Sequence, residues 1–227
     1  MGNFDSIMNK IQEKTVVIGI IGLGYVGLPL AVSFARKGIT ILGFEKNKSK
    51  VSAINAGKNY IADVNEEELI AVVTEKKLSA TVDFSRLSEC DATIVCVPTP
   101  LDKFKKPDMS YIEASCRDIG RYMKLGTFVC LESTTYPTTT EDFMKPILEK
   151  ESGLKEGSDF WLCFSPERVD PGNKDYKTDN TPKVVGALGK EALDIAMALY
   201  GLAIQHLHPV SSPRAAEMVK IDRKSVV

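Results

Sequence analysis

Three glycines near the N-terminus have the spacing of a phosphate-binding turn. The run GLGYVG, residues 22–27, lies directly between a short β-branched apolar run and a segment with a helical pattern. Gly22 would form the tight turn, Gly24 would let the backbone approach a pyrophosphate, and Gly27 would let the helix pack closely on the strand. The helix N-terminus supplies N–H groups and a partial positive charge. A plain tight turn is the alternative interpretation. The strand and helix patterns on either side favour a phosphate-binding turn. The cofactor contacts predicted here are Gly22, Gly24, Tyr25, Val26 and Gly27.

An acidic residue follows at the end of the second predicted strand. Glu45 lies at roughly the offset, about 20 residues, at which a carboxylate binds the adenosine ribose diol of a dinucleotide. Since an acid there would repel a 2′-phosphate, it favours NAD over NADP. NADP stays an alternative because three lysines near this position could bind its 2′-phosphate: Lys46, Lys48 and Lys50. A solvated helix face explains the same lysines. Lys50 is included among the predicted cofactor contacts.

Three further segments, residues 97–101, 132–137 and 165–168, follow predicted strands. Ligands of open α/β sheets lie at the carboxyl ends of the strands, so these segments are candidates for the same crevice. Their alternatives are a strand ending at proline, a helix N-cap and a surface ion pair. Pro98, Thr99 and Thr134 are added to the predicted cofactor contacts, and Glu167 and Arg168 are further candidates to reach a ligand.

Strand and helix patterns alternate along most of the chain, which predicts an α/β fold. Repeated strand–helix–strand units pair in parallel through right-handed crossovers, giving a Rossmann-like, doubly wound parallel sheet with helices on both faces. We expect a polar leader over residues 1–14, which could form a short helix, and the main domain over 15–208. A helix capped by one of the threonines after the run 132–137 is also expected, as is a long irregular loop over 166–181.

Composition restricts the classes of function. With 29 basic and 30 acidic residues, the chain has no net basic field to attract nucleic acid or a membrane surface. The five cysteines form no CxxC pair and mostly fall in apolar runs, which predicts small buried hydrophobic residues and no metal site. No run approaches the length of a membrane span and no signal-peptide pattern is present, so a cytoplasmic protein is expected.

Six motifs in this order resemble the UDP-glucose/GDP-mannose dehydrogenase family: GIIGLGYVGLPLA, CVPTPLD, LESTTYPTTTE, FSPERVDPGN, PKVVG and AAEMVK. The FSPERVDPGN segment is most similar to the branch acting on UDP-N-acetylhexosamines. The resemblance implies two successive NAD-dependent oxidations of the sugar C6 alcohol, through an aldehyde, to a carboxylate. It also implies a homodimer, with residues 209–227 forming the start of its linker and dimerisation helix.

Site roles follow from the resemblance, residue by residue. Glu167 would be the base for the hydrolytic water, Thr134 would position that water or the nicotinamide, and Lys220 would stabilise the oxyanion of the tetrahedral states. Glu167 and Arg168 would contact the UDP-sugar. Carboxylate and ammonium groups near one reacting carbon suit the hydrolysis of a thioester.

The chain also departs from the family pattern. Thr138 and Ala187 stand where the family usually has glycine, which leaves the backbone conformation at Thr138 open. Lys224 stands where an asparagine is usual, and none of the five cysteines lies in the Gly-rich setting of the family's catalytic cysteine. We therefore expect an N-terminal fragment that binds NAD and does not complete the oxidation alone.

Two other interpretations are considered. A β-hydroxyacid or 6-phosphogluconate type of dehydrogenase shares the fold and a lysine on a following helix, but it lacks the PTPLD and SPER segments. A non-catalytic NAD-binding module, or a remnant of an enzyme, is compatible with the missing cysteine. The presence or absence of a following segment with a Gly-rich Cys-Leu-Pro motif would discriminate these alternatives.

Overall fold

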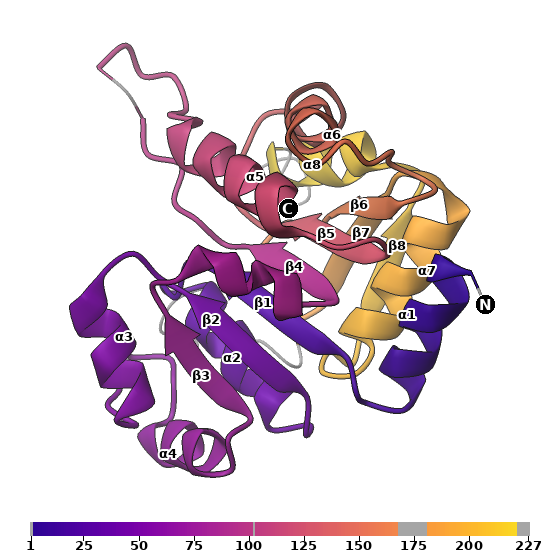
Figure 1. Cartoon of the computed structure of the whole chain (residues 1–227). Helices are drawn as coiled ribbons and strands as arrows, with labels where there is room; N and C mark the ends of the chain where they lie inside the picture. The colour runs from indigo at the N-terminus through magenta and orange to yellow at the C-terminus, as the bar shows by residue number, and fades with distance from the viewer. Residues whose placement is uncertain (1, 102, 168–180, 222–227) are drawn as a thin grey trace.

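A single mostly parallel sheet forms the centre of the molecule (Figure 1). The computed structural model describes residues 2–101, 103–167 and 181–221. Within these residues the sheet has eight strands in the order β3-β2-β1-β4-β5-β6-β7-β8. The strands are β1 (Val17–Ile21), β2 (Thr40–Phe44), β3 (Leu78–Thr81), β4 (Ala92–Val95), β5 (Thr127–Leu131), β6 (Phe160–Phe164), β7 (Lys183–Ala187) and β8 (Leu207–Val210).

Helices cover both faces of the sheet, as predicted for a doubly wound fold (Figure 1). One hydrophobic core includes side chains of α1 (Asn3–Gln12), α2 (Gly27–Ala35), α3 (Lys48–Asn55), α4 (Glu66–Thr74) and α7 (Gly189–Tyr200). A second core includes side chains of the 3₁₀ helix η1 (Phe84–Glu89), α5 (Ser110–Tyr122), the π-helical turn η2 (Thr139–Met144), α6 (Lys145–Ser152) and α8 (Pro213–Ile221).

The apolar runs form central strands because both of their faces are covered. In β1, Ile18 and Ile20 pack into the first core and Ile21 packs into the second, as the two-residue period of a strand requires. All three are at most 3% exposed. The predicted short helix at the N-terminus is also present, and Ile7 and Ile11 attach it to the first core, where it packs against α7.

The expectation of parallel pairing throughout is wrong at one position. β6 and β7 pair antiparallel, whereas each of the other described neighbours pairs in parallel. A parallel neighbour needs a crossover that returns the chain to the same end of the sheet. The sequence between β6 and β7 has no helical pattern that would provide one. The predicted loop over 166–181 lies mostly outside the described residues.

Two short strands, β3 and β8, were not predicted from the sequence. β8 pairs in parallel with β7 and contains residue 208, at which the predicted main domain ends. The next helix, α8, packs against β6, β7 and η2, so it belongs to the same folded body. Of residues 209–227, those after 221 lie outside the described part.

The described helices include none that is long and apolar enough to cross a membrane. All five cysteines are free and buried, which confirms their prediction as small core residues. β1 and β4 are neighbours in the middle of the sheet. From β1 the chain adds β2 and β3 on one side, and it then continues from β4 on the other side, so the carboxyl ends of β1 and β4 mark the point where the strand order reverses. Ligands of doubly wound folds bind at such a point.

Candidate functional site

The glycine turn joins β1 to α2 at this point. Gly22 has a φ of 90°, and a Cβ there would lie 2.8 Å from the Cys96 carbonyl oxygen. At Gly27 a Cβ would lie 1.9 Å from the Gly22 carbonyl oxygen, so α2 can begin this close to β1 only without a side chain. A Cβ at Gly24 would meet no atom within 4 Å. Backbone packing therefore requires glycine at 22 and 27, whereas Gly24 borders open space.

Glu45 lies just beyond β2, beside this turn. Its carboxylate accepts hydrogen bonds from the Leu23 N–H at 3.4 Å and the Asn47 N–H at 3.0 Å. Lys50 Nζ lies 3.9 Å from Glu45 Oε2 and 5.5 Å from the ring centroid of Tyr60. Burial, with a contribution from the Glu45 carboxylate, raises the pKa of Tyr60, whose hydroxyl donates to the Leu23 carbonyl. This region can therefore present a carboxylate to a ribose diol.

The segments after β4 and β5 are joined by hydrogen bonds. Thr99 Oγ1 donates to the Thr134 carbonyl at 2.5 Å, and Ser133 Oγ donates to the Val97 carbonyl at 2.6 Å. The predicted residues Pro98, Thr99 and Thr134 line one cavity. The Thr99 hydroxyl thus holds the two segments together at the edge of the sheet.

The segment after β6 brings the predicted base to the same cavity. Glu167 is 9% exposed, and Lys220 on α8 donates a hydrogen bond from Nζ to the Glu167 carbonyl. Although 53 positions separate them in the sequence, the two residues are in contact. Arg168, predicted as a substrate contact, lies outside the described residues.

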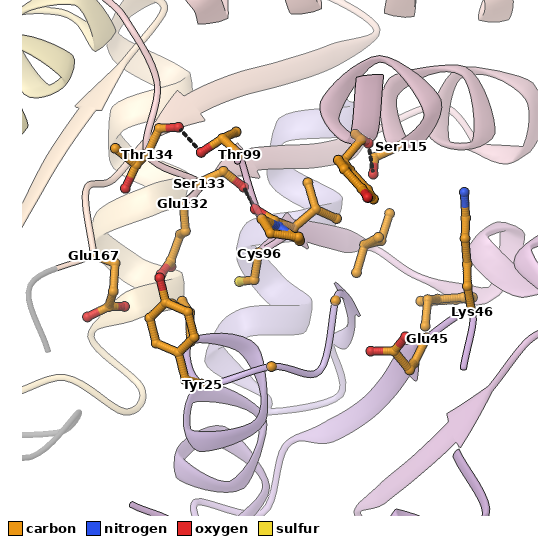
Figure 2. A pocket seen from close by; sticks show the side chains of 18 of the residues that line it. Tyr25, Glu45, Lys46, Cys96, Thr99, Ser115, Glu132, Ser133, Thr134 and Glu167 are labelled. Carbon is orange, nitrogen blue, oxygen red and sulfur yellow. Dashed lines mark hydrogen bonds between the residues drawn. The ribbon is translucent and has the colours of Figure 1, made fainter. Parts of the chain in front are cut away.

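These groups line a cavity of about 660 Å³ along the carboxyl ends of the strands. Figure 2 shows Glu45 and Lys46 at one end, and Glu132, Thr134 and Glu167 at the other. We call these the Glu45 end and the Glu167 end. The lining residues are Ile21, Gly22, Gly24, Tyr25, Val26, Phe44, Glu45, Lys46, Lys50, Phe84, Cys96, Val97, Pro98, Thr99, Tyr111, Ser115, Glu132, Ser133, Thr134, Glu167 and Lys220.

Sequence reasoning missed a buried polar network behind the Glu167 end. Lys183 Nζ lies 2.9 Å from Glu132 Oε2, and the Tyr200 hydroxyl donates to Glu132 Oε1 at 2.5 Å. Burial, with a contribution from Glu167, raises the pKa of Glu132, whereas the Lys183 ammonium and the Tyr200 hydroxyl act to lower it. The 2.9 Å contact with Lys183 Nζ favours the carboxylate form. Burial acts to lower the pKa of Lys183, but the Glu132 and Glu167 carboxylates outweigh it and raise that pKa, so the ammonium persists. The sequence signal that could have indicated this network is Lys183, a lysine at the start of an otherwise apolar strand.

A second missed residue is Glu217 on α8. It is fully buried, and its carboxylate accepts hydrogen bonds from the Thr138 N–H at 2.6 Å, and from the N–H and hydroxyl of Thr140. The expected threonine cap is therefore wrong: Thr138, at the N-cap position, makes no side-chain capping hydrogen bond, and the acceptor comes from α8. Thr138 has a φ of 78°, so it adopts the left-handed conformation that glycine favours.

The cavity fits a nicotinamide dinucleotide. Its volume is within the usual range for small-molecule sites, about 300–1,000 Å³. Gly24 leaves room for a close approach of phosphate, and α2 begins beside it without a side-chain cap. When bound, NAD would supply a hydride acceptor, while the protein would supply a carboxylate at Glu167 and an ammonium at Lys220.

Known proteins share this combination of fold and motifs. The profile of the UDP-glucose/GDP-mannose dehydrogenase family, NAD binding domain, matches residues 16–204. The UDP-N-acetyl-D-glucosamine 6-dehydrogenase of Pseudomonas aeruginosa is 37% identical over 209 residues, covering 92% of this chain and 49% of the relative. The UDP-N-acetyl-D-mannosamine dehydrogenase of Pyrococcus horikoshii is 34% identical over 205 residues, covering 90% of this chain and 49% of the relative.

Solved structures give the same result. The NDP-N-acetyl-D-galactosaminuronic acid dehydrogenase of Methanosarcina mazei superposes with a TM-score of 0.86 at 36% identity, covering 97% of this chain and 49% of that one. The chain thus spans about half the length of the relatives it matches. The profile match extends from before β1 to beyond α7, and so includes the glycine turn, Glu45 and the segments after β4, β5 and β6. The chain therefore belongs to the UDP-glucose/GDP-mannose dehydrogenase family and contains that family's NAD-binding domain.

Proposed function

We propose that this chain is the NAD-binding part of a UDP-N-acetylhexosamine 6-dehydrogenase. The observation that supports it is the arrangement of the cavity, with Glu45 at one end and Thr134, Glu167 and Lys220 at the other. NAD would lie with its adenosine ribose at Glu45, its phosphates at the glycine turn and its nicotinamide towards Thr134. The relatives named above act on N-acetylated sugar nucleotides, which supports this substrate class.

The residues at the Glu167 end have complementary chemical roles. The Glu167 carboxylate takes a proton from the water that hydrolyses the acyl product of the second oxidation. The Lys220 ammonium stabilises the negative charge that develops on the reacting oxygen, and Thr134 orients the water or the nicotinamide. All five cysteines are buried, and burial raises the thiol pKa of Cys96, the one that lines the cavity, so none of them is proposed as the nucleophile of the oxidation.

Binding measurements on the chain itself test the proposal. The chain is titrated with NAD and NADP, and the NAD-saturated chain is then titrated with UDP-N-acetylglucosamine, UDP-N-acetylmannosamine and UDP-glucose. We expect NAD to bind more tightly than NADP, and an N-acetylated sugar nucleotide to bind more tightly than UDP-glucose. Each mixture is also monitored for NADH absorbance, which should not appear.

Three results would contradict parts of the proposal. Robust NADH formation by this chain alone would show that it carries its own nucleophile. Equal binding of UDP-glucose would contradict the N-acetylhexosamine assignment. No binding of any sugar nucleotide to the NAD-loaded chain would favour a non-catalytic NAD-binding module. The homodimer expected from the family remains a prediction, which the molar mass in solution would test.

A further inference from the structure

We propose that the buried Glu132–Lys183 pair makes this pocket favour the oxidised form of its nicotinamide cofactor. The inference rests on the orientation proposed above, with the nicotinamide at the Glu167 end. It assigns a function to two residues that lie outside the glycine turn in the sequence and that have no role at the reacting carbon in the proposed scheme. Both would act on the cofactor through their charges.

The pair is oriented with its negative member towards the cavity. Glu132 lines the pocket and Lys183 does not, although Nζ and Oε2 are only 2.9 Å apart. Their side chains are 0% and 8% exposed, respectively. The Tyr200 hydroxyl, at 2.5 Å, fixes the other Glu132 oxygen, and Lys183 Nζ lies 5.1 Å from the Tyr200 ring centroid. The result is a fixed dipole in a region from which water is excluded.

The charge of the nicotinamide ring changes during the reaction. The ring of NAD⁺ carries a positive charge, and it becomes neutral when it accepts a hydride, that is, one proton and two electrons. A negative potential at the ring therefore stabilises the oxidised form more than the reduced form. Because charge interactions are stronger where water is excluded, a buried carboxylate is more effective here than an exposed one.

Other charged groups at this end have to be considered together. Glu167 carries the same sign as Glu132, and its side chain also faces the cavity. Lys220 carries the opposite sign, and its Nζ is directed to the Glu167 carbonyl. Burial raises the pKa of Cys96 well above its usual range, so this thiol adds no charge. Of these groups, Glu132 is the one whose two carboxyl oxygens both accept hydrogen bonds in the described part of the chain, one from Lys183 and one from Tyr200.

The test compares the affinities for NAD⁺ and NADH in Glu132→Gln, which keeps the side-chain shape and removes the negative charge. NAD⁺ and NADH are titrated separately, and the ratio Kd(NADH)/Kd(NAD⁺) is calculated. We expect this ratio to fall by at least about 10-fold, the effect of one unit charge about 12 Å away in a medium of effective dielectric about 20. A purely structural role would weaken both nucleotides equally and leave the ratio unchanged.

Asp91→Asn is the matched control. Asp91 is 5% exposed and is paired with Lys10 at 2.6 Å and Lys124 at 2.9 Å, but it precedes β4, at the edge opposite the pocket. Loss of this carboxylate should leave the Kd ratio unchanged. If Glu132→Gln does not fold, the double variant Glu132→Gln with Lys183→Met removes both charges, and the ratio should still fall, by about 3-fold.

The outcomes separate this inference from the proposed function. An unchanged ratio in a folded variant that still binds both nucleotides would overturn the inference and leave the NAD site intact. An equal fall of the ratio in Asp91→Asn would also overturn it. If the unmodified chain binds neither nucleotide, the proposed cofactor site itself is refuted. A failure to bind UDP-sugars leaves this measurement unaffected.

Discussion

The two ends of the pocket are built in different ways. The contacts described at the Glu45 end join residues within 22–60, and its charged groups are partly exposed: the Lys50 and Glu45 side chains are 40% and 15% exposed. At the Glu167 end, residues from several distant segments meet, and the Glu132–Lys183 pair is almost fully buried. The Glu45 end therefore depends on residues that are close along the chain, whereas the Glu167 end depends on buried charged groups that the fold brings together.

This difference determines how each end should respond to substitution. Exposed ion pairs contribute about 0–1 kcal/mol because water screens them and the side chains lose freedom. Removal of one partner from a buried pair costs about 3–5 kcal/mol because the other charge is left without compensation. Substitutions at the Glu45 end should change mainly binding, and those at the Glu167 end should change stability as well.

The largest effect is expected for Lys183→Met. Glu132 would keep its Tyr200 contact but lose its counter-charge in a buried position, so the free energy of unfolding should fall by about 3–5 kcal/mol. Urea denaturation measures this change. Lys190→Met removes the exposed Lys190–Asp194 pair and should change stability by less than about 0.5 kcal/mol. Similar losses in both variants would contradict the contrast between buried and exposed pairs.

Gly27→Ala should come next and should affect folding of the glycine turn. A Cβ 1.9 Å from the Gly22 carbonyl oxygen would force the start of α2 away from β1, at a cost of about 3 kcal/mol. Gly24→Ala is the matched variant, because its Cβ meets no protein atom. We expect it to retain stability and to lose NAD affinity. Thermal denaturation and NAD titration of both variants are required, and unchanged NAD affinity in Gly24→Ala would refute the phosphate position.

Glu45→Gln should change cofactor choice while leaving the fold intact. Without the carboxylate, a 2′-phosphate would no longer be repelled, and Lys50, which lies 3.9 Å from Glu45, could contact it. The preference for NAD over NADP should fall about 10-fold, which corresponds to about 1.4 kcal/mol. Competitive titration with the two nucleotides measures the ratio. Glu67→Gln in the first turn of α4 serves as a control and should preserve the preference.

Thr138→Gly should produce the smallest effect, a gain in stability. A β-branched residue at a φ of 78° is strained by about 1–3 kcal/mol, and the greater freedom of glycine in the unfolded chain offsets part of the relief. The net gain should be about 0.5–1 kcal/mol. Gly153→Ala makes the reverse change at a φ of 73° and should lower stability. A loss of stability in Thr138→Gly would mean that the threonine side chain stabilises this turn.

Local signals predicted most of the fold. The glycine turn and the alternation of strand and helix patterns indicated elements that the structure contains. Asn47 and Asn65 cap α3 and α4 with their side chains. The short strands β3 and β8 were missed because each has only four residues and a mixed apolar and polar pattern. The antiparallel β6–β7 pair was missed because strand direction depends on the connection and not on the strand's own residues.

The sequence by itself determined the glycine turn and the position of Glu45, since both depend on residues that are close along the chain and on the conformational freedom of glycine. Only the tertiary structure decided that Lys183 pairs with Glu132, that Glu217 rather than a threonine caps η2, and that Lys220 contacts Glu167. Those contacts join segments that are 51 to 79 positions apart. Their partners are selected by burial, because a charged or polar group removed from water must find whichever complementary group the packed helices and strands place beside it.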